Sequence, residues 1–400
     1  CLFKVMQLSI QAIIGFVVAA GLAVASELPS PMTVNLERRK MLVTKNDTVD
    51  FKAVRKQANA LNYKYDKLLR NFRKNTGRDH PLLHLLLDLI DKRDGKGDVD
   101  LDDIGEGQLW AGDVQFGQSK FKIDFDTGSA DTLVNPFVYF PHRSKSSRKT
   151  HHTFSTAYGD GTTASGFIYT DDLKIGGYQA KDVAIGLSVT KFINDEDNQG
   201  IAGMSFPAVQ SFPKKFDPFF IALVKQKVVP EPVFQFTLKR GSGSTLHLGG
   251  IDNSRFQGEL SYVDVNPEDG FWISEGKVNG KKIDACIDTG SSIIFGPIDE
   301  VREVITKMDG VTPFTAGGAL HGAFDCSKPP KLDFEFAGQK FNLGENQVSF
   351  GKYQGQCVLS IMGQKNLPMN AWVVGDSFLQ TASVVFDMGK NRMGFAPTSN

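Results

Sequence analysis

The sequence reads Phe-Asp-Thr-Gly-Ser at residues 125–129, and it repeats this stretch as Ile-Asp-Thr-Gly-Ser at residues 287–291. Each copy follows an apolar, strand-like run, and further apolar residues come after it. A strand that stops at Asp-Thr-Gly and then resumes is a strand–turn–strand unit, with the aspartate at the tip and a glycine where the backbone turns tightly. A single unit is compatible with a plain surface turn. Two units in matching surroundings predict a duplicated lobe, with Asp126 and Asp288 brought face to face.

The repeat continues downstream of both turns. Two apolar residues followed by a glycine occur again at Gly203 and at Gly375, after similar intervals. Such a run indicates a strand that passes beside the turn, so close that a side chain in place of the glycine would clash.

The composition is that of a globular protein. The 400 residues are 41% hydrophobic and 22% charged, and this length is sufficient for two domains. The 40 glycines and 31 phenylalanines, with few helical periodicities, favour an all-β architecture. Helical patterns are confined to residues 49–72, 81–90, 213–227 and 299–307.

The sequence contains no glycine-rich phosphate loop, no zinc-site spacing and no nucleic-acid motif. The adjacent His151 and His152 would point to opposite faces of an extended chain, so they do not predict a metal site. We therefore expect no cofactor, no metal and no nucleic-acid partner.

Charge is distributed unevenly along the chain. Residues 26–93 carry 15 Lys and Arg against 8 Asp and Glu, a net charge of +7, whereas residues 94–400 carry 29 against 37, a net charge of −8. A basic segment therefore precedes an acidic body. The basic segment closes with the dibasic pair Lys92-Arg93, which is a predicted processing site.

Residues 1–25 are predicted to be a secretory signal peptide. They contain Lys4, an apolar run from Leu8 to Val24 and the small residues Ala23-Val24-Ala25 as a cleavage site. The alternative is a transmembrane anchor, since the run approaches the length that spans a bilayer.

Two carboxylates within about 3 Å of each other cannot both ionise, so they share one proton and titrate as a pair. One member can then take a proton from a water held between them while the other protonates the carbonyl oxygen that the water attacks. This chemistry needs neither a metal nor a covalent nucleophile.

The two turns, the Tyr-Gly-Asp-Gly stretch at residues 158–161 and the C-terminal residues 373–397 resemble the pepsin family of aspartic endopeptidases, of the secreted fungal type and in zymogen form. The resemblance covers residues 105–400. It implies an all-β, bilobal pepsin-like fold with the cleft between an N-terminal lobe in residues 94–262 and a C-terminal lobe in residues 263–400. It also implies a secreted monomer, with the vacuole as the alternative location, that acts on proteins and peptides at acidic pH and is inhibited by statine-type compounds. By the same resemblance, residues 26–93 are an activation propeptide that inhibits the enzyme. This basic propeptide can cover the acidic cleft at neutral pH and lose its attraction when acid protonates the carboxylates.

The resemblance also implies roles for individual residues. Asp288 is the base and Asp126 the protonated partner, although the residues alone leave this order open and the pair is one titrating unit. Ser129 and Ser291 would hydrogen-bond the outer carboxylate oxygens. The other residues that support the dyad are Thr127, Gly128, Thr289 and Gly290.

Further residues are assigned through the same resemblance. Tyr158, Gly159 and Asp160 belong to a flap that closes over the substrate. Phe192 and Ile201 fall at positions of the S1 pocket, or else in the core. Cys326 and Cys357 form a disulfide in the C-terminal lobe, and Lys64 is the propeptide lysine expected between the catalytic aspartates. For Cys286 the prediction comes from its place in the strand that enters the second turn, which indicates a buried free thiol.

The sequence departs from the family at Leu133, where many members have a tryptophan bonded to the flap tyrosine. Strand alternation places Asp124 on the same face as Asp126. We therefore hypothesise that Asp124 and Asp160 allow Lys at P1 beside hydrophobic residues such as Phe and Leu, by pairing with its ammonium group. The alternative is that both acids are solvated.

A protein of this fold that binds without catalysis is the competing interpretation. Such relatives usually lack a catalytic aspartate, a glycine of the triplet or the flap tyrosine, and this sequence has all of them. Catalysis is the favoured prediction.

Overall fold

The computed structural model describes residues 29–38, 47–83, 110–157, 163–193, 198–240 and 242–399. Residues 31–400 form one compact unit. The predicted signal peptide, the pair Lys92-Arg93 and the flap residues 158–161 lie outside the described residues. No helix among the described residues combines the length and the apolar character needed to cross a membrane.

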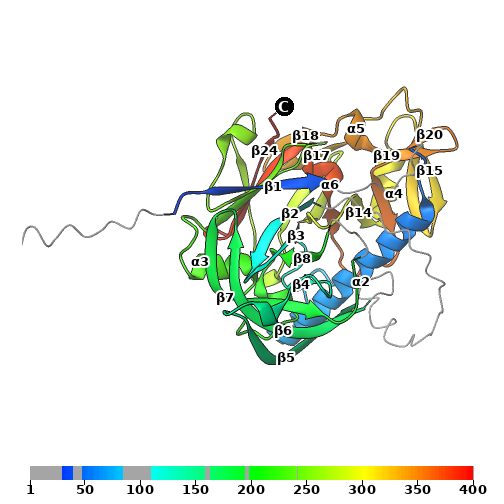
Figure 1. Cartoon of the computed structure of the whole chain (residues 1–400). Coiled ribbons are helices and arrows are strands. Elements are labelled where there is room, and N and C mark those ends of the chain that lie inside the picture. Colours follow the sequence, from blue (N-terminus) through cyan, green and yellow to red (C-terminus); the bar gives the residue numbers. More distant parts are fainter. Residues whose placement is uncertain are drawn as a thin grey trace, which may run out of the picture. The chain divides into compact units, whose positions relative to one another are not determined.

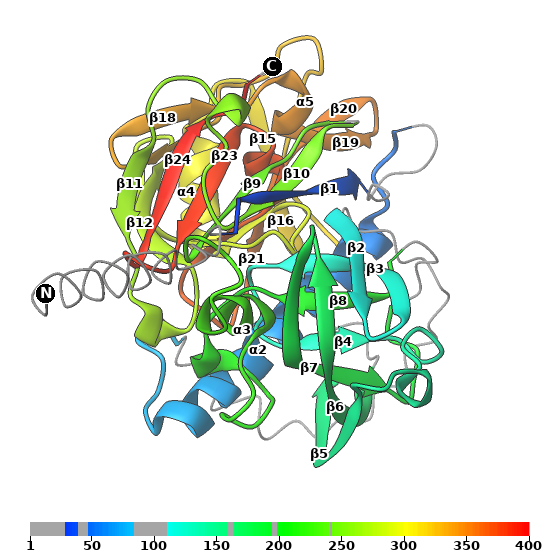
Figure 2. The same cartoon turned by 60° about the vertical axis from the view of Figure 1, so that its left-hand side comes forward.

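Strands dominate the structure, as Figures 1 and 2 show. Within the described residues, one sheet of 13 strands has the order β11-β24-β23-β9-β10-β1-β2-β3-β8-β4-β7-β6-β5, and β2 also pairs with β6. Its strands are β1 (Met32–Arg38), β2 (Trp110–Phe116), β3 (Ser119–Asp126), β4 (Thr132–Val134), β5 (Arg148–Ala157), β6 (Thr163–Ile175), β7 (Tyr178–Ser188), β8 (Gly200–Gly203), β9 (Val233–Thr237), β10 (Ser244–Leu248), β11 (Ser261–Asp264), β23 (Ala382–Asp387) and β24 (Arg392–Pro397).

The second sheet contains 11 of the described strands. Its order is β18-β17-β12-β13-β22-β14-β21-β16-β20-β19, and β15 pairs with β16 at its side. Its strands are β12 (Ile273–Val278), β13 (Lys281–Ile287), β14 (Ile294–Pro297), β15 (Val311–Ala316), β16 (Ala319–Phe324), β17 (Asp333–Phe336), β18 (Gln339–Asn342), β19 (Ser349–Tyr353), β20 (Gln356–Leu359), β21 (Ile361–Gln364) and β22 (Trp372–Val374).

The two sheets contain the same local arrangement of strands. In the first, β3 lies parallel to β8, and β4 runs antiparallel to β8. In the second, β13 lies parallel to β22, and β14 runs antiparallel to β22. The predicted all-β, bilobal fold built on a duplicated motif is therefore confirmed.

The larger sheet contains strands from both halves of the chain. β23 pairs with β9, and β24 pairs with β11, so the sheet spans both sides of residue 262. The predicted boundary between the lobes at that position stays a prediction.

The predicted helical pattern of residues 49–72 forms a single helix, α2 (Phe51–Thr76), which crosses the strands of both lobes in Figure 1. Asp50 caps its N-terminus by accepting hydrogen bonds from the backbone N–H groups of Lys52 and Ala53 at 2.9 and 3.2 Å. Gly77 ends it in the left-handed conformation, with φ of 77°. One face of the helix is apolar and buried, and its members are Ala53, Val54, Ala58, Leu61, Tyr65, Leu68, Leu69 and Phe72.

Of the next two predicted helices, the first is shorter than its pattern and the second has the same length. The patterns at 213–227 and 299–307 correspond to α3 (Phe219–Lys225) and α4 (Ile298–Thr306). The pattern at 81–90 is described only as far as residue 83, where Leu83 makes a β-bridge with Met369. The remaining described α-helices are α5 (Glu345–Val348) and α6 (Asp376–Leu379).

The cysteines follow the prediction. Cys326 and Cys357 form a disulfide between the end of β16 and β20, and Cys286 on β13 is buried and free. Closing this loop of 31 residues is worth about 3–4 kcal/mol by the loop-entropy estimate.

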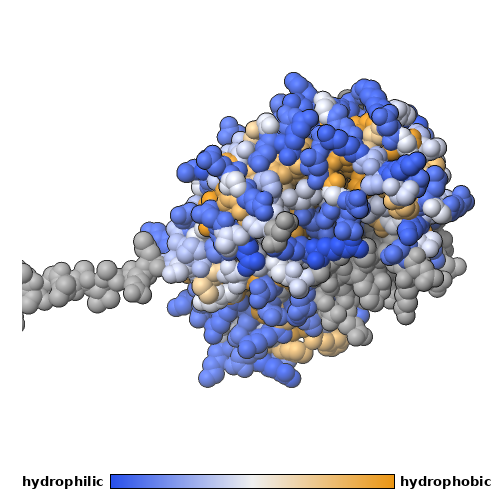
Figure 3. All heavy atoms as spheres, turned by 90° about the horizontal axis from the view of Figure 1, so that it is seen from above, coloured by the Kyte–Doolittle hydropathy of each residue, from blue (hydrophilic) through white to orange (hydrophobic). Residues whose placement is uncertain are grey.

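The face that Figure 3 shows is mainly hydrophilic, and hydrophobic groups occur on it in scattered patches. Among the described residues the large hydrophobic side chains that are exposed are Tyr63, Phe137, Phe167 and Val189.

Candidate active site

The two Asp-Thr-Gly turns meet where the lobes join. Asp126 ends β3 and is 3% exposed, and Asp288 follows β13 and is fully buried. A Cβ on Gly128 would overlap the carboxylate of Asp288, and a Cβ on Gly290 would overlap that of Asp126. Each turn therefore needs its glycine to let the opposite carboxylate approach.

The neighbouring strands lie as close to the turns as predicted. A Cβ on Gly203 would collide with the backbone of Ala130, and a Cβ on Gly375 would collide with the backbone of Ser291. β8, which is parallel to β3, therefore lies beside the first turn, and β22, which is parallel to β13, lies beside the second turn in the same way.

The two threonines exchange hydrogen bonds between the lobes. Thr127 Oγ1 donates to the carbonyl oxygen of Ile287 at 2.8 Å, and Thr289 Oγ1 donates to that of Phe125 at 2.6 Å. Each hydroxyl also accepts from the backbone N–H of the other threonine at 3.0 Å. All of these groups are buried, so the network fixes the spacing of the two turns.

Each carboxylate is held by its own turn in the same way. The N–H of Gly128 donates to Asp126 Oδ1 at 2.9 Å, and Ser129 Oγ donates to Oδ2 at 2.6 Å. At the second turn the N–H of Gly290 donates to Asp288 Oδ1 at 3.0 Å, and Ser291 Oγ donates to Oδ2 at 2.8 Å. The two carboxylates therefore have matched positions.

Lys64 of α2 lies between the two carboxylates. Its Nζ is 2.8 Å from Asp126 Oδ1 and 3.0 Å from both oxygens of Asp288. The next residue, Tyr65, donates its hydroxyl to Asp288 Oδ2 at 2.9 Å and lies 3.4 Å from Cys286 Sγ. The ammonium group thus lies where two carboxylates could otherwise hold a water.

The two carboxylates differ in their electrostatics, because the hydrogen bond between them raises the pKa of Asp126 and lowers that of Asp288, whereas Lys64 lowers both. Burial raises the pKa of Asp126 to about 6, against the opposing charge of Lys64. Burial also acts to raise the pKa of Asp288, but Lys64 and the hydrogen bonds from Asp126 and Ser291 outweigh it, and the pKa falls below its ordinary value. Burial acts to lower the pKa of Lys64, but the two aspartates outweigh burial and raise it, so Lys64 is a cation wherever they are ionised.

Amide side chains along α2 hydrogen-bond the helix to the rest of the protein. Gln57 Nε2 donates to Ser292 Oγ at 2.8 Å. Asn71 Nδ2 donates to the carbonyl oxygen of Val209 at 3.2 Å, and Asn75 Nδ2 donates to that of Gln210 at 2.9 Å. The apolar face of the helix packs against residues of both lobes, namely Ala130, Val209, Phe271, Cys286, Ile293, Phe295 and Phe350. The helix therefore covers the dyad.

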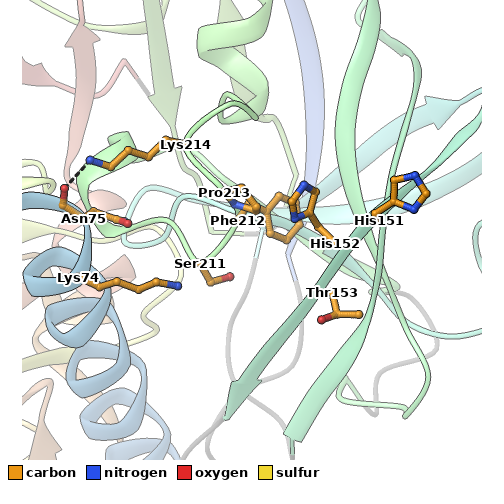
Figure 4. A pocket seen from close by; sticks show the side chains of 9 residues that line it. All are labelled: Lys74, Asn75, His151, His152, Thr153, Ser211, Phe212, Pro213 and Lys214. Atoms are coloured by element: carbon orange, nitrogen blue, oxygen red, sulfur yellow. Dashed lines mark hydrogen bonds between the residues drawn. The ribbon is translucent and has the colours of Figure 1, made fainter.

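A pocket of about 550 Å³ lies at the C-terminal end of α2, and Figure 4 shows its lining. Lys74 and Asn75 of the helix face His152 on β5 and the loop that contains Ser211 and Lys214. Lys214 Nζ donates to the carbonyl oxygen of Asn75 at 2.6 Å. Among the described residues no group of three His, Cys, Asp or Glu side chains could hold a metal ion.

Asp124 is not solvated, which corrects one of the two alternatives for this residue. It is 2% exposed and lies opposite Ala111 and Ile201 in the sheet. Burial and the charge of Asp126 raise its pKa well above the ordinary value. Strand alternation predicted the face of the sheet correctly, but it could not predict what covers that face.

The two residues expected at the S1 pocket lie near each other. Phe192 belongs to a small buried cluster, and Ile201 packs against it. Leu133, which replaces the usual tryptophan, is a member of the same cluster. Their contribution to an S1 pocket stays a prediction, and so do the flap residues Tyr158, Gly159 and Asp160, which lie outside the described residues.

Several residues around the site were not predicted from the sequence. Tyr65 is one of them, although it directly follows Lys64 and an aromatic residue beside that lysine was a usable indication. Gln57, Asn71 and Asn75 read as ordinary polar positions of an amphipathic helix, so nothing in the sequence pointed to their contacts.

Comparison with known proteins gives a consistent result. The family model described as eukaryotic aspartyl protease matches residues 109–398. The chain is 99% identical over 395 residues to "Secreted aspartyl protease 1" of Malassezia globosa, which covers 99% of this chain and 100% of that protein. It is 32% identical over 323 residues to "Aspartic protease" of Phaffia rhodozyma, covering 74% of this chain and 78% of that protein. It is 29% identical over 308 residues to "Aspergillopepsin-1" of Aspergillus fumigatus, covering 71% and 77%.

Proposed function

The chain belongs to the eukaryotic aspartyl protease family, and from this membership we propose that residues 26–93 hold a secreted aspartic endopeptidase in an inactive zymogen form. The observation that carries the proposal is the contact of Lys64 Nζ with both carboxylates of the dyad. The enzyme class follows from the family, and secretion agrees with the name of the relative that is 99% identical.

The proposed reaction uses a water between Asp126 and Asp288. Asp288 takes a proton from the water, which attacks the peptide carbonyl carbon, while Asp126 gives its proton to the carbonyl oxygen. The higher pKa of Asp126 supports this order. Lys64, which lowers both pKa values, leaves with the propeptide, so the mature dyad is treated as one titrating unit.

The proposed inhibition depends on the ionised aspartates. The propeptide lowers the pKa of Asp288 by contact with Lys64, so this contact stabilises the covered state at neutral pH and is lost as the pH falls and the carboxylate takes up a proton. Lys64 itself, with a raised pKa, stays charged throughout this range. Acid therefore weakens the contact from the aspartate side.

Replacing Lys64 with methionine tests the proposal. We expect Lys64→Met zymogen to activate at a higher pH than the wild type, and to activate faster at each pH, because the propeptide loses its charge contact with the dyad. Activity against a fluorogenic peptide is measured after jumps to a series of pH values between 3 and 7. Lys74→Met, at the exposed end of the same helix, is the matched control. An activation profile that is the same for both variants and the wild type would remove Lys64 from the inhibitory role.

We also propose a second route to maturation, in which another protease cuts after Lys92-Arg93. Replacing both residues with glutamine should abolish this route and leave acid activation unchanged. The N-terminus of the mature protein, read by mass spectrometry with and without added processing protease, separates the two routes.

For specificity we propose hydrophobic residues at P1, with Lys accepted as well. Phe192 and Ile201 lie in or against an apolar cluster, which supports the first part. Asp124 lies two residues before the dyad on the same strand, and Asp160 is expected on the flap. A peptide library in which P1 varies should yield cleavage after Phe, Leu and Lys. Asp124→Asn should reduce cleavage after Lys far more than after Phe, and the reduction should be confined to the higher pH values tested, because the raised pKa of Asp124 keeps this carboxyl group neutral at low pH. Rejection of Lys at every pH tested would contradict the idea.

The proposed partners follow from the same site. A statine-type inhibitor should compete with substrate in the processed enzyme and should bind the zymogen poorly, because Lys64 and Tyr65 occupy the dyad. The flap of Tyr158, Gly159 and Asp160 is proposed to close over substrate, and the enzyme is proposed to act as a monomer.

A further inference from the structure

A buried histidine packs at each end of helix α2. We propose that His80 and His321 form a latch, meaning that protonation of their rings releases the propeptide helix independently of the catalytic carboxylates. The inference rests on the proposed inhibitory role of residues 26–93 and adds a regulation of the same site. Neither histidine takes part in the chemistry described above.

His80 lies just beyond the C-terminal end of the helix. Its ring packs edge-on against Phe72 of α2, with centroids 4.9 Å apart, and against Phe271 of the C-terminal lobe at 5.6 Å. The N–H of Leu82 donates to Nδ1 at 3.1 Å, so Nδ1 must be an unprotonated acceptor. Nε2 therefore carries the hydrogen and donates to the carbonyl oxygen of Asp269 at 3.0 Å. These partners fit only the neutral ring.

Protonation of His80 would place a second N–H against the N–H of Leu82. The ring is 3% exposed, so neither group could turn to water without moving the chain. Leu82 also accepts, through its carbonyl oxygen, a hydrogen bond from the N–H of Asn370 at 2.7 Å. The ring thus holds a short segment that joins the propeptide to the C-terminal lobe.

His321 lies under the N-terminal end of the helix. Its ring is fully buried and packs against Phe51, the first residue of α2, at 5.1 Å, and against Phe314 at 5.3 Å. Nε2 donates to the carbonyl oxygen of Ala316 at 3.2 Å. Nδ1 is buried without a hydrogen-bond partner among the described residues, so a proton there would be a buried charge with no acceptor.

The charged groups around the two rings differ. Beside His80, the carboxylate of Asp269 favours a proton on the ring and the guanidinium of Arg78 opposes it, and Arg78 itself lies 3.7 Å from Asp269 and 4.0 Å from Glu268. Burial prevails, and the pKa of His80 is lowered. His321 is surrounded by aromatic rings. Arg55 of α2 lies near Gly317, which follows the Ala316 that accepts the hydrogen bond from His321. Burial lowers the pKa of His321 to about 4.

The two rings are too far from the dyad to act through it. With a rise of 1.5 Å per residue, Phe51 is about 20 Å and Phe72 about 12 Å along the helix from Lys64. Both separations exceed the screening length of about 8 Å at physiological salt. The latch therefore works through local contacts at the helix ends.

The sign of the effect follows from linkage. Each ring has a lower pKa when the helix is docked than when the helix has left and the ring meets water. The docked state therefore binds fewer protons, and docking weakens as the pH falls below the ordinary histidine value of about 6.5. Because the two histidines take up two further protons on release, the release rate should depend more steeply on pH than it would through the dyad alone.

The experiment compares the full-length zymogen with His80→Gln, His321→Gln and the double variant. Glutamine can keep one donor and one acceptor and does not titrate. The rate at which activity against a short peptide appears is measured after jumps to pH values between 3 and 7. We expect each single variant to lower the slope of log rate against pH by up to about one and to move the midpoint to lower pH. The double variant should show the sum of the two effects.

His142→Gln is the control, because His142 is an exposed histidine on the N-terminal lobe, away from α2. Slopes and midpoints equal to the wild type in both single variants would overturn the proposal. If His321→Gln does not fold, His80→Gln decides alone, since residue 80 lies in the segment that maturation removes. A failure of the inhibitory role itself looks different: wild-type zymogen kept at pH 7 and then moved to the acidic assay would show full activity at once, with no lag.

Discussion

Two residues before Asp126 the chain has Asp124, and two residues before Asp288 it has Cys286. Both side chains are buried, and burial raises the pKa of each. The hydrogen bonds that the two turns provide to their own aspartates are nearly identical, yet the pKa of Asp126 is raised and that of Asp288 is lowered. The repeated motif thus gives the two aspartates the same geometry, and the hydrogen bond between them, which raises the pKa of Asp126 and lowers that of Asp288, makes them different.

The first way to break this comparison is to remove one carboxylate at a time. Asp126→Asn and Asp288→Asn should each lower kcat on a peptide substrate by at least about 10³-fold, because the acid and the base are needed in the same step. Both variants are processed with an added protease and assayed at acidic pH. Asp264→Asn, on β11 and exposed, is the control. Substantial activity in either dyad variant would mean that the two turns are not equivalent partners.

The second prediction concerns the threonines that link the lobes. Thr127→Val and Thr289→Val should each lower the free energy of unfolding by about 2–5 kcal/mol, because each leaves a buried carbonyl oxygen and a buried N–H without partners. The losses should be equal, and Thr→Ser at either position should restore most of the stability. Denaturant unfolding monitored by fluorescence measures this, and a loss confined to one of the two positions would contradict the symmetry.

The third prediction sharpens the difference between Asp124 and Cys286. The raised pKa of Asp124 means that the folded protein disfavours its charged form, so stability is lost as the pH rises above the unfolded value of 3.8. Asp124→Asn should therefore raise the free energy of unfolding at pH 7, and the gain should vanish near pH 3. Cys286→Ser should show no such pH dependence between pH 3 and 7, because the thiol stays neutral there. A gain at pH 7 that persists at pH 3 would refute the electrostatic explanation.

The smallest effect is expected from Cys286→Ala. The change removes one buried sulfur atom and should lower the free energy of unfolding by about 1 kcal/mol. The midpoint of acid activation should stay within experimental error, since the contact of the thiol with Tyr65 is weak beside the two contacts of Lys64. A clear shift of that midpoint would assign the thiol a part in holding the propeptide.

Much of this site could be predicted because its sequence motif occurs twice in the chain. The duplicated Asp-Thr-Gly turns predicted the dyad, and the glycines at 203 and 375 predicted the strands beside it. Lys64 and the pairing of Cys326 with Cys357 came from resemblance. What could not be predicted depends on contacts across the fold. The burial of Asp124, the hydroxyl of Tyr65 on Asp288 and the neutral ring of His80 each depend on a segment far away in the chain that covers or faces the residue.

The hydrogen bonds that Thr127 and Thr289 donate across the lobes also mean that one working site needs one copy of each half of the chain. Each half of the chain supplies one carboxylate, and one threonine hydroxyl of each half donates a hydrogen bond to the backbone of the other half. If the mature chain were cut in the connection between β10 and β11, neither fragment alone would hold a working site. Activity would return only on mixing, and at low concentration it would rise with the product of the two fragment concentrations, as for a heterodimer encoded in one chain.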